Sequence, residues 1–332
     1  IAKTKLAALE IVNADVNASA AIAGSKISPT FTTDGSFNSV SIGKGTNSVS
    51  TNTALGIRAV NDASVSGGNN TGIGYQALQD LTSGTVNTGV GFNSLNSNTT
   101  GHSNTGVGYN AGFGNETGVH NVAIGTSALD AAASTSLNVA VGSNALTNNT
   151  ANNNTAVGYQ ALTTNTSGTR NTAVGVIALG DNTTAHDNVG VGYNAGTNNT
   201  TGASNTFVGS ETGGVNTTGY SNAAFGKRAL YSNTTGIENT ALGKDALYAN
   251  TTANYNTAVG TDALTANTTG TLNTAVGRLA GQLLTTGNDN TFIGDRAGSQ
   301  CTTNGQNTFI GGRAGSQVTG QQNTALGFFA NY

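Results

Sequence analysis

Residues 154–170 read Asn-Thr-Ala-Val-Gly-Tyr-Gln-Ala-Leu-Thr-Thr-Asn-Thr-Ser-Gly-Thr-Arg, and this stretch decides the fold. Its leading motif, Asn-Thr-Ala-Val-Gly, returns along almost the whole chain, with a step of 17 in the numbering between most copies, 18 once and 16 twice. A period this constant is the signature of a repeat architecture. We number the places of one copy from 1 to 17, starting at its asparagine. The place-1 residues are Asn52, Asn70, Asn87, Asn104, Asn121, Asn138, Asn154, Asn171, Asn188, Asn205, Asn222, Asn239, Asn256, Asn273, Asn290, Asn307 and Asn323.

The residue types within one copy predict its local structure, and Asn154, Val157, Gly158, Ala161 and Leu162 represent the structural repeat. Place 4 is always a larger apolar residue and place 3 is mostly Ala or Gly, which predicts a short strand with place 4 inward and place 3 against a close surface. The glycine at place 5 permits a positive φ or a close backbone approach. Places 8 and 9 predict a second short buried strand, and places 12 to 15, with their Asn and Gly, predict a turn.

The length of the period predicts the fold class. It is too short for a pair of helices and too long for a hexapeptide step, so each copy fits one coil of an all-β, parallel β-roll or β-solenoid. Coils that stack at about 4.8 Å would form a shaft roughly 77 Å long. The place-1 asparagines would then stack in a ladder, with their amides hydrogen-bonded along the shaft. Proline cannot donate to such a ladder, and Pro29, the only proline, precedes the array.

The chain divides into a connector and a shaft. Residues 1–37 are rich in Ala and lack the regularly spaced Asn and Gly of the repeat, so we expect them to join the shaft to an upstream protein. Residues 38–332 form the repetitive shaft, which begins with a shorter, degenerate copy that starts at Asn38 and ends before Asn52. The array stops inside its last copy at Tyr332, and solenoid ends need caps. We therefore expect a C-terminal cap or tip that this sequence does not contain.

Composition and charge exclude several classes of function. Charged residues make up 8% of the chain and the net charge of −3 is spread without blocks, so clustered cations for nucleic acid or a membrane surface are missing. Apolar stretches such as Ala20–Ala23 are far shorter than the roughly 20 residues that span a bilayer. Cys301 is the only cysteine, and no Cys/His metal spacing occurs. Glycine pairs such as Gly106 and Gly108 follow from the repeat, and the acidic residues are isolated. We expect no enzymatic activity, no metal and no cofactor.

The thin coil predicts an oligomer. Each coil buries about one Val, one Leu and one Ala, and the transfer free energy of these side chains falls short of the entropy lost when a whole copy becomes ordered. The small place-3 residues, such as Ala156, offer a face on which chains could pack closely. We therefore expect three chains to pack their place-3 faces around a common axis as a homotrimeric fibre.

The pattern Asn-x-Ala-Val/Ile-Gly-x-x-Ala resembles the head repeats of YadA-like trimeric autotransporter adhesins. The longer repeat, as at residues 154–162, and the segment 13–27 (Asn-Ala-Asp-Val-Asn-Ala-Ser-Ala-Ala-Ile-Ala-Gly-Ser-Lys-Ile) resemble bacteriophage tail fibres. This resemblance implies a left-handed β-roll wound as a homotrimer, and a viral tail or side fibre that is extracellular, belongs to the virion and supports host-cell attachment. Residues 1–37 would then meet an upstream fibre or a tail or baseplate protein. The alternative is the head of a bacterial trimeric surface adhesin, located on the cell surface.

Two regular arrays suggest sharper functions. Tyr75, Phe92 and Tyr109 occupy place 6 in three consecutive coils, so they are candidate contacts for a host-surface glycan, or they stack on one another along the shaft. The sequence favours self-stacking, with recognition residing beyond Tyr332. Threonines at places 13 and 14, such as Thr200 and Thr201, give the remote alternative of an ice-binding solenoid. The three histidines, His102, His120 and His186, fall in turns and match no triad or metal spacing, so we expect them to be solvated.

Overall fold

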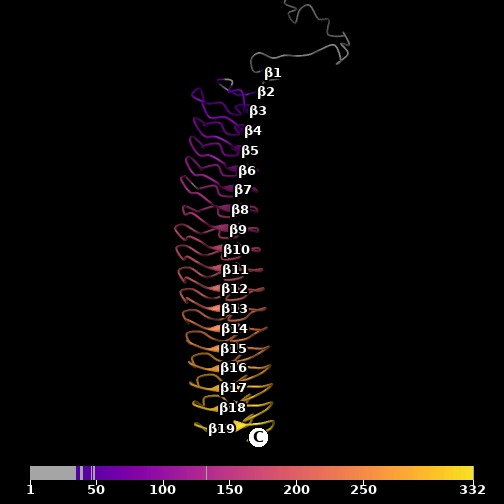
Figure 1. Cartoon of the computed structure of the whole chain (residues 1–332), viewed down its shortest axis with the longest axis vertical. Helices are drawn as coiled ribbons and strands as arrows, with labels where there is room; N and C mark the ends of the chain where they lie inside the picture. Colours follow the sequence, from indigo (N-terminus) through magenta and orange to yellow (C-terminus); the bar gives the residue numbers. More distant parts are fainter. Residues whose placement is uncertain (1–34, 38–39, 46, 48, 132, 332) are drawn as a thin grey trace, which may run out of the picture.

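The computed structural model describes residues 35–37, 40–45, 47, 49–131 and 133–331, and these residues form one elongated column of stacked coils (Figure 1). Within these ranges the protein is all-β and contains no α-helix, so no helix there could cross a membrane. The connector expected at residues 1–37 lies outside the described residues except for its last three, and so does Asn38.

The strands are short and recur once per coil. They are β1 (Gly35–Phe37), β2 (Val40–Gly43), β3 (Thr53–Gly56), β4 (Thr71–Ile73), β5 (Thr88–Val90), β6 (Thr105–Val107), β7 (Val122–Ile124), β8 (Val139–Val141), β9 (Thr155–Val157), β10 (Thr172–Val174), β11 (Val189–Val191), β12 (Thr206–Val208), β13 (Ala223–Phe225), β14 (Thr240–Leu242), β15 (Thr257–Val259), β16 (Thr274–Val276), β17 (Thr291–Ile293), β18 (Thr308–Ile310) and β19 (Thr324–Leu326). In Figure 1 the strands lie one below the other along the column.

Strands β3 to β19 form a parallel ladder in which each strand pairs with the strand of the next coil. The register joins equivalent places: Ala156 of β9 faces Ala173 of β10, and Val157 faces Val174. Repeating residues in equivalent positions therefore form rows along the shaft. The predicted all-β parallel solenoid, in which each copy of the repeat forms one coil, is confirmed.

The first two strands differ from the coils that follow. β1 pairs antiparallel with β2, and β2 pairs antiparallel with β3. The stretch that we aligned as a degenerate first copy is therefore not a parallel coil. Residues 44–52 are all that connects β2 to β3, and a short connection allows an antiparallel return whereas a parallel neighbour needs a longer crossover.

The two faces of each strand are the reverse of the prediction. Ala156 at place 3 is 0% exposed and lies inside the coil, whereas Val157 at place 4 is 36% exposed and faces outward. Place 3 is buried in strand after strand, as at Ala173, Ala224 and Ala258. The small residue is internal because the opposite wall of so thin a coil lies close to it. Place 3 consequently cannot be the face on which three chains meet.

Places 3 and 9 are complementary in size, and together they fill the interior. Seven of the seventeen coils combine Ala at place 3 with Leu at place 9, such as Ala156 and Leu162, which are both fully buried. Where place 3 holds Phe207, the adjacent place-9 residues are Gly196 and Gly213, and a Cβ on either would lie 2.7 Å or less from the phenyl ring. In these coils a large side chain at one place therefore accompanies a small residue at the other, as close packing requires.

The second predicted strand is a tight corner instead. Places 6 to 11 of most coils are turns, and the residues at places 7 and 9 have positive φ, for example 54° at Gln160 and 50° at Leu162. Bonds between coils hold this backbone: the Leu162 N–H donates to the Ala178 carbonyl at 3.1 Å. The glycine at place 5 was predicted correctly, since Gly158 has φ 140° and a Cβ there would lie 2.3 Å from the Gly175 carbonyl oxygen.

The predicted ladder of place-1 asparagines is confirmed, and it is buried. The Asn171 backbone N–H donates to Oδ1 of Asn154 at 3.0 Å, and the Asn171 Nδ2 donates to the same oxygen at 3.3 Å. Nδ2 of Asn171 also donates to the Ala185 carbonyl at 2.8 Å. Each amide therefore joins two coils and ties a turn to the strand beside it.

A second ladder of asparagines runs inside the shaft at place 12, where the sequence predicted turn residues. Asn165 and Asn182 are fully buried, and Nδ2 of Asn182 donates to Oδ1 of Asn165 at 2.7 Å. These asparagines lack positive φ, so their role is to satisfy polar groups in the interior and not to shape a turn. Apolar residues replace them in some coils, at Leu81, Leu284 and Cys301.

Candidate functional site

The representative repeat residues divide between interior and surface. Asn154, Ala161 and Leu162 are fully buried, and Gly158 forms the bend after the strand. Val157 lies in a row of outward-facing place-4 side chains, one on each strand from β3 to β19. We call this row the apolar stripe. Its members are Leu55, Ile73, Val90, Val107, Ile124, Val141, Val157, Val174, Val191, Val208, Phe225, Leu242, Val259, Val276, Ile293, Ile310 and Leu326.

The candidate aromatic contacts stack on one another. The ring centroids of Tyr75 and Phe92 lie 5.0 Å apart with 14° between their planes, and those of Phe92 and Tyr109 lie 5.3 Å apart at 11°. All three side chains are exposed. Because the faces of the central ring are covered by its neighbours, the surface offers mostly ring edges to a sugar. The geometry favours the structural interpretation of this row.

We expect the triple variant Tyr75→Ser, Phe92→Ser and Tyr109→Ser to lower the thermal stability, and we expect these three rings to make no contribution to glycan binding. Two stacked pairs are lost, which corresponds to about 1–3 kcal/mol at 0.5–1.5 kcal/mol for each pair. Thermal melting followed by circular dichroism and a glycan-binding assay measure the two effects. A well-folded triple variant that loses glycan binding would contradict this assignment.

The threonines at place 13 form hydrogen bonds that join successive coils. Oγ1 of Thr200 donates to the Thr217 carbonyl at 3.1 Å. The same bond from one coil to the next recurs at Thr82, Thr99, Thr150, Thr166, Thr183, Thr217, Thr234, Thr251, Thr268 and Thr285. These hydroxyl hydrogens are already engaged, so no specific observation favours an ice-binding role for this row.

Three arginines pair with an aspartate at the same place of the next coil. Arg170 contacts Asp187 through Nε and Nη2 at 2.6 and 2.9 Å, and Arg228 contacts Asp245 at 2.8 and 3.0 Å. The third pair joins Arg278 to Asp295 at 2.9 and 3.3 Å. Because the coils stack in register, residues that lie one period apart in the sequence become neighbours and form bidentate ion pairs.

These ion pairs and burial shift three pKa values. Hydrogen bonds from Arg170 and His186 hold the pKa of Asp187 well below its ordinary value. Burial raises the pKa of Asp245, but hydrogen bonds from Lys244 and Arg228 outweigh it and the pKa falls below the usual range. Burial raises the pKa of the Cys301 thiol to about 11, so the reactive thiolate is scarce at neutral pH.

The three histidines are exposed, in agreement with their predicted position in turns. His102 and His120 lie edge to face with ring centroids 5.3 Å apart, and Nδ1 of His186 lies 2.8 Å from an Asp187 carboxylate oxygen. Among the described residues, no three His, Cys, Asp or Glu side chains come close enough together to hold a metal ion.

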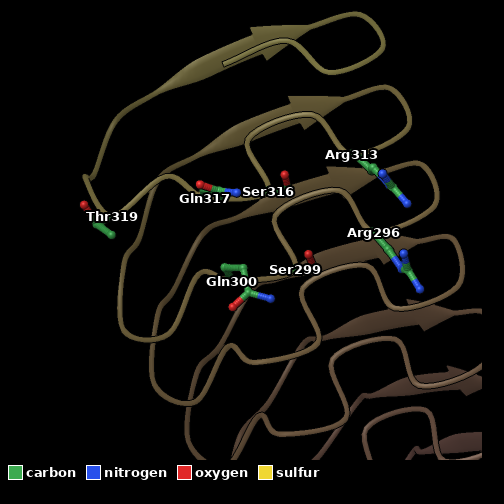
Figure 2. Close-up of a pocket in the computed structure, with 7 residues that line it drawn as sticks. All are labelled: Arg296, Ser299, Gln300, Arg313, Ser316, Gln317 and Thr319. Atoms are coloured by element: carbon green, nitrogen blue, oxygen red, sulfur yellow. The ribbon is translucent and has the colours of Figure 1, made fainter. Parts of the chain in front are cut away.

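A groove that sequence reasoning missed lies near the C-terminal end of the column, on the last coils (Figure 2). Its volume is about 580 Å³, and it is formed by equivalent residues of successive coils. We call it the arginine groove. Its lining consists of Arg296, Ser299, Gln300, Arg313, Ser316, Gln317 and Thr319.

Comparison with known proteins does not assign the chain to a family. No protein-family model matches it, and a search of curated proteins gives no match.

Proposed function

We propose that the chain is the shaft of a homotrimeric viral tail or side fibre that supports attachment to a host cell, and that it is not an enzyme. The observation that carries the proposal is the apolar stripe. Single apolar residues on a surface are ordinary, but a continuous row marks a surface that another molecule covers. At about 4.8 Å for each coil, the stripe is roughly 77 Å long.

The apolar stripe replaces the place-3 face as the proposed contact between chains. Val157 and Val174 are 36% and 37% exposed, and Ile124 and Phe225 of the same row are exposed to a similar degree. Each strand is paired through its backbone to the next coil, so the side chains on the outer face are what remains to be covered. Three parallel copies around one axis would cover the stripe of each chain over its full length.

The role in a fibre is supported by the repetition and by the resemblance of the repeat to phage tail fibres. A rod of equivalent coils sets a distance, and its length grows with the number of repeats. Residues 1–37 would join an upstream fibre, tail or baseplate protein. Gold-labelled antibody that decorates the tail or side fibres of purified virions would support the proposal, and labelling confined to the bacterial cell surface would support the adhesin alternative instead.

We expect light scattering to give about three times the 32.9 kDa mass of the chain. The double variant Val157→Glu and Val174→Glu should be folded and monomeric, because the stripe would bring carboxylates of three chains together. The control is Thr184→Glu with Thr201→Glu, which adds the same charges at exposed place-14 positions and should stay trimeric. A monomeric wild-type chain, or a stripe variant that remains trimeric, would refute the assembly.

A further inference from the structure

Two arginines of the arginine groove differ from the paired arginines of the shaft. Arg296 and Arg313 occupy place 7 of successive coils, where Arg228 has Asp245 as its partner one coil on. Within the described residues, neither Arg296 nor Arg313 forms an ion pair, and the sequence contains no Asp or Glu after Asp295. Asp295 itself is engaged by Arg278 at 2.9 Å. Two like charges therefore lie one rung apart, an arrangement that destabilises a ladder.

The backbone holds both arginines in the same conformation. Their φ values are 58° and 57°, and the Arg296 and Arg313 N–H groups donate to the carbonyls of Arg278 and Asp295 at 2.9 and 2.8 Å. The Arg313 guanidinium lies over the Phe329 ring at 5.2 Å from its centroid. Figure 2 shows the two side chains parallel, one above the other. Both side chains are thus half-buried on a fixed backbone, and the ring contact also restrains Arg313, which lowers the entropy lost on binding.

The groove also contains a hydroxyl group that the fold leaves unsatisfied. At place 10 of other coils, the hydroxyls of Thr147, Thr163 and Thr197 donate to a place-7 carbonyl of the preceding coil at 2.8–3.0 Å. Ser316 occupies the same place and is 6% exposed, yet its Oγ has no hydrogen-bond partner among the described residues. A buried polar group without a partner is costly, so a ligand oxygen that reached this hydroxyl would remove that cost.

From these observations we propose that the arginine groove binds an acidic saccharide through its carboxylate or sulfate group. The two guanidinium groups provide planar donors that match an oxyanion, as aspartates of the shaft match Arg170, Arg228 and Arg278. Ser316 adds a donor inside the groove. The exposed side chains of Gln300, Gln317 and Thr319 supply the hydrogen bonds that sugar hydroxyls need. This binding activity goes beyond the proposed structural role and does not depend on the number of chains in the fibre.

Calorimetric titration of the full chain tests the proposal with three hexasaccharides: a sulfated one derived from heparin, an oligogalacturonate that carries only carboxylates, and neutral maltohexaose. We expect binding of at least one acidic sugar and none of the neutral one. Binding of both acids would assign the site to oxyanions in general, and binding of one would identify the preferred group. Equal binding of maltohexaose, or binding of neither acid, would overturn the proposal.

Matched variants separate a built site from general attraction to positive charge. The double variant Arg296→Gln and Arg313→Gln should weaken binding at least tenfold, and Ser316→Ala should weaken it by a smaller factor. The control Arg170→Gln with Arg228→Gln removes the same charge from paired arginines that lie several coils from the groove, and it should leave the affinity unchanged. Equal losses in the two double variants would overturn the proposal. The wild-type melting temperature should also rise with the acidic sugar, whereas the mass measurement tests the trimer separately.

Discussion

We expect Ala156→Asp to prevent the coil that contains it, and the coils next to it, from folding. This effect should occur in the single chain. Ala156 is 0% exposed, and its strand neighbours are Ala140 and Ala173. A carboxylate there has no cation to pair with, and an unpaired buried charge costs several kcal/mol even after the surroundings relax. The expected loss exceeds about 4 kcal/mol, which is exceptional for one substitution.

The control is Gln160→Asp, which introduces the same charge into the same coil at place 7. Asp245 and Asp262 already occupy this place in other coils, so we expect little change in stability. Hydrogen exchange across β8, β9 and β10 measures the difference, because coils in a repeat protein contact only their neighbours and local loss is visible. Native protection of these strands in Ala156→Asp would contradict an interior place 3.

The period was readable from the sequence because each coil must present the same residue type to the coil above and below. Asn154 and Asn171 form a hydrogen bond only if their spacing keeps them in register. The regular spacing of the asparagines in the sequence therefore indicates the ladder directly. The same argument predicted the bend at Gly158. These features depend on local geometry repeated many times, and they need no knowledge of what lies across the coil.

The orientation of the strand could not be read from alternation alone. Alternation separates Ala156 from Val157 but does not say which of them is inside. Preference for burying the larger side chain gave the wrong answer. One signal was present: Phe207 replaces alanine at place 3 in a coil where place 9 is Gly213, and this exchange of sizes shows that the two places pack against each other.

The corner at places 6 to 11 was missed because the leucine that is common at place 9 does not signal positive φ. Leu162 is neither Gly nor Asn, yet its φ is 50°. The side chain must fill the interior, and bonds between coils compensate for the strained backbone. At such a position, packing and hydrogen bonds between coils override the backbone preference of the residue.

Part of the arginine groove could be predicted from a repeated segment of the sequence, which the overall composition does not reveal. Residues 296–300 and 313–317 both read Arg-Ala-Gly-Ser-Gln, one period apart, so identical side chains must lie one above the other. The ion pairs could be anticipated in the same way, since Arg228 and Asp245 share a place. The hollow beside the arginines and the unpaired hydroxyl of Ser316 depend on three-dimensional packing and could not be predicted.

The second large effect is expected for Asn171→Leu, which removes one rung of the buried place-1 ladder. Oδ1 of Asn171 accepts the Asn188 backbone N–H at 3.0 Å, and this N–H would have no partner left. An orphaned buried donor costs about 1–3 kcal/mol, and the two bonds that Nδ2 of Asn171 donates add about 1 kcal/mol each. We therefore expect a loss of about 3–5 kcal/mol, seen as lower thermal stability and faster exchange in β9 to β11.

Asn267→Leu provides the matched comparison, because it makes the same exchange in the place-12 ladder. The next coil already has Leu284 at this place, and the Asn267 Oδ1 is buried without a partner. The Gly270 carbonyl, which Asn267 serves, keeps a second donor in Asn256. No backbone N–H is orphaned, so the expected loss is about 1–2 kcal/mol. Equal losses of stability in the two variants would show that the backbone N–H bond to the place-1 amide adds nothing beyond the side-chain bonds. A larger loss for Asn171→Leu identifies the place-1 amide oxygen as the acceptor that the backbone of each coil requires.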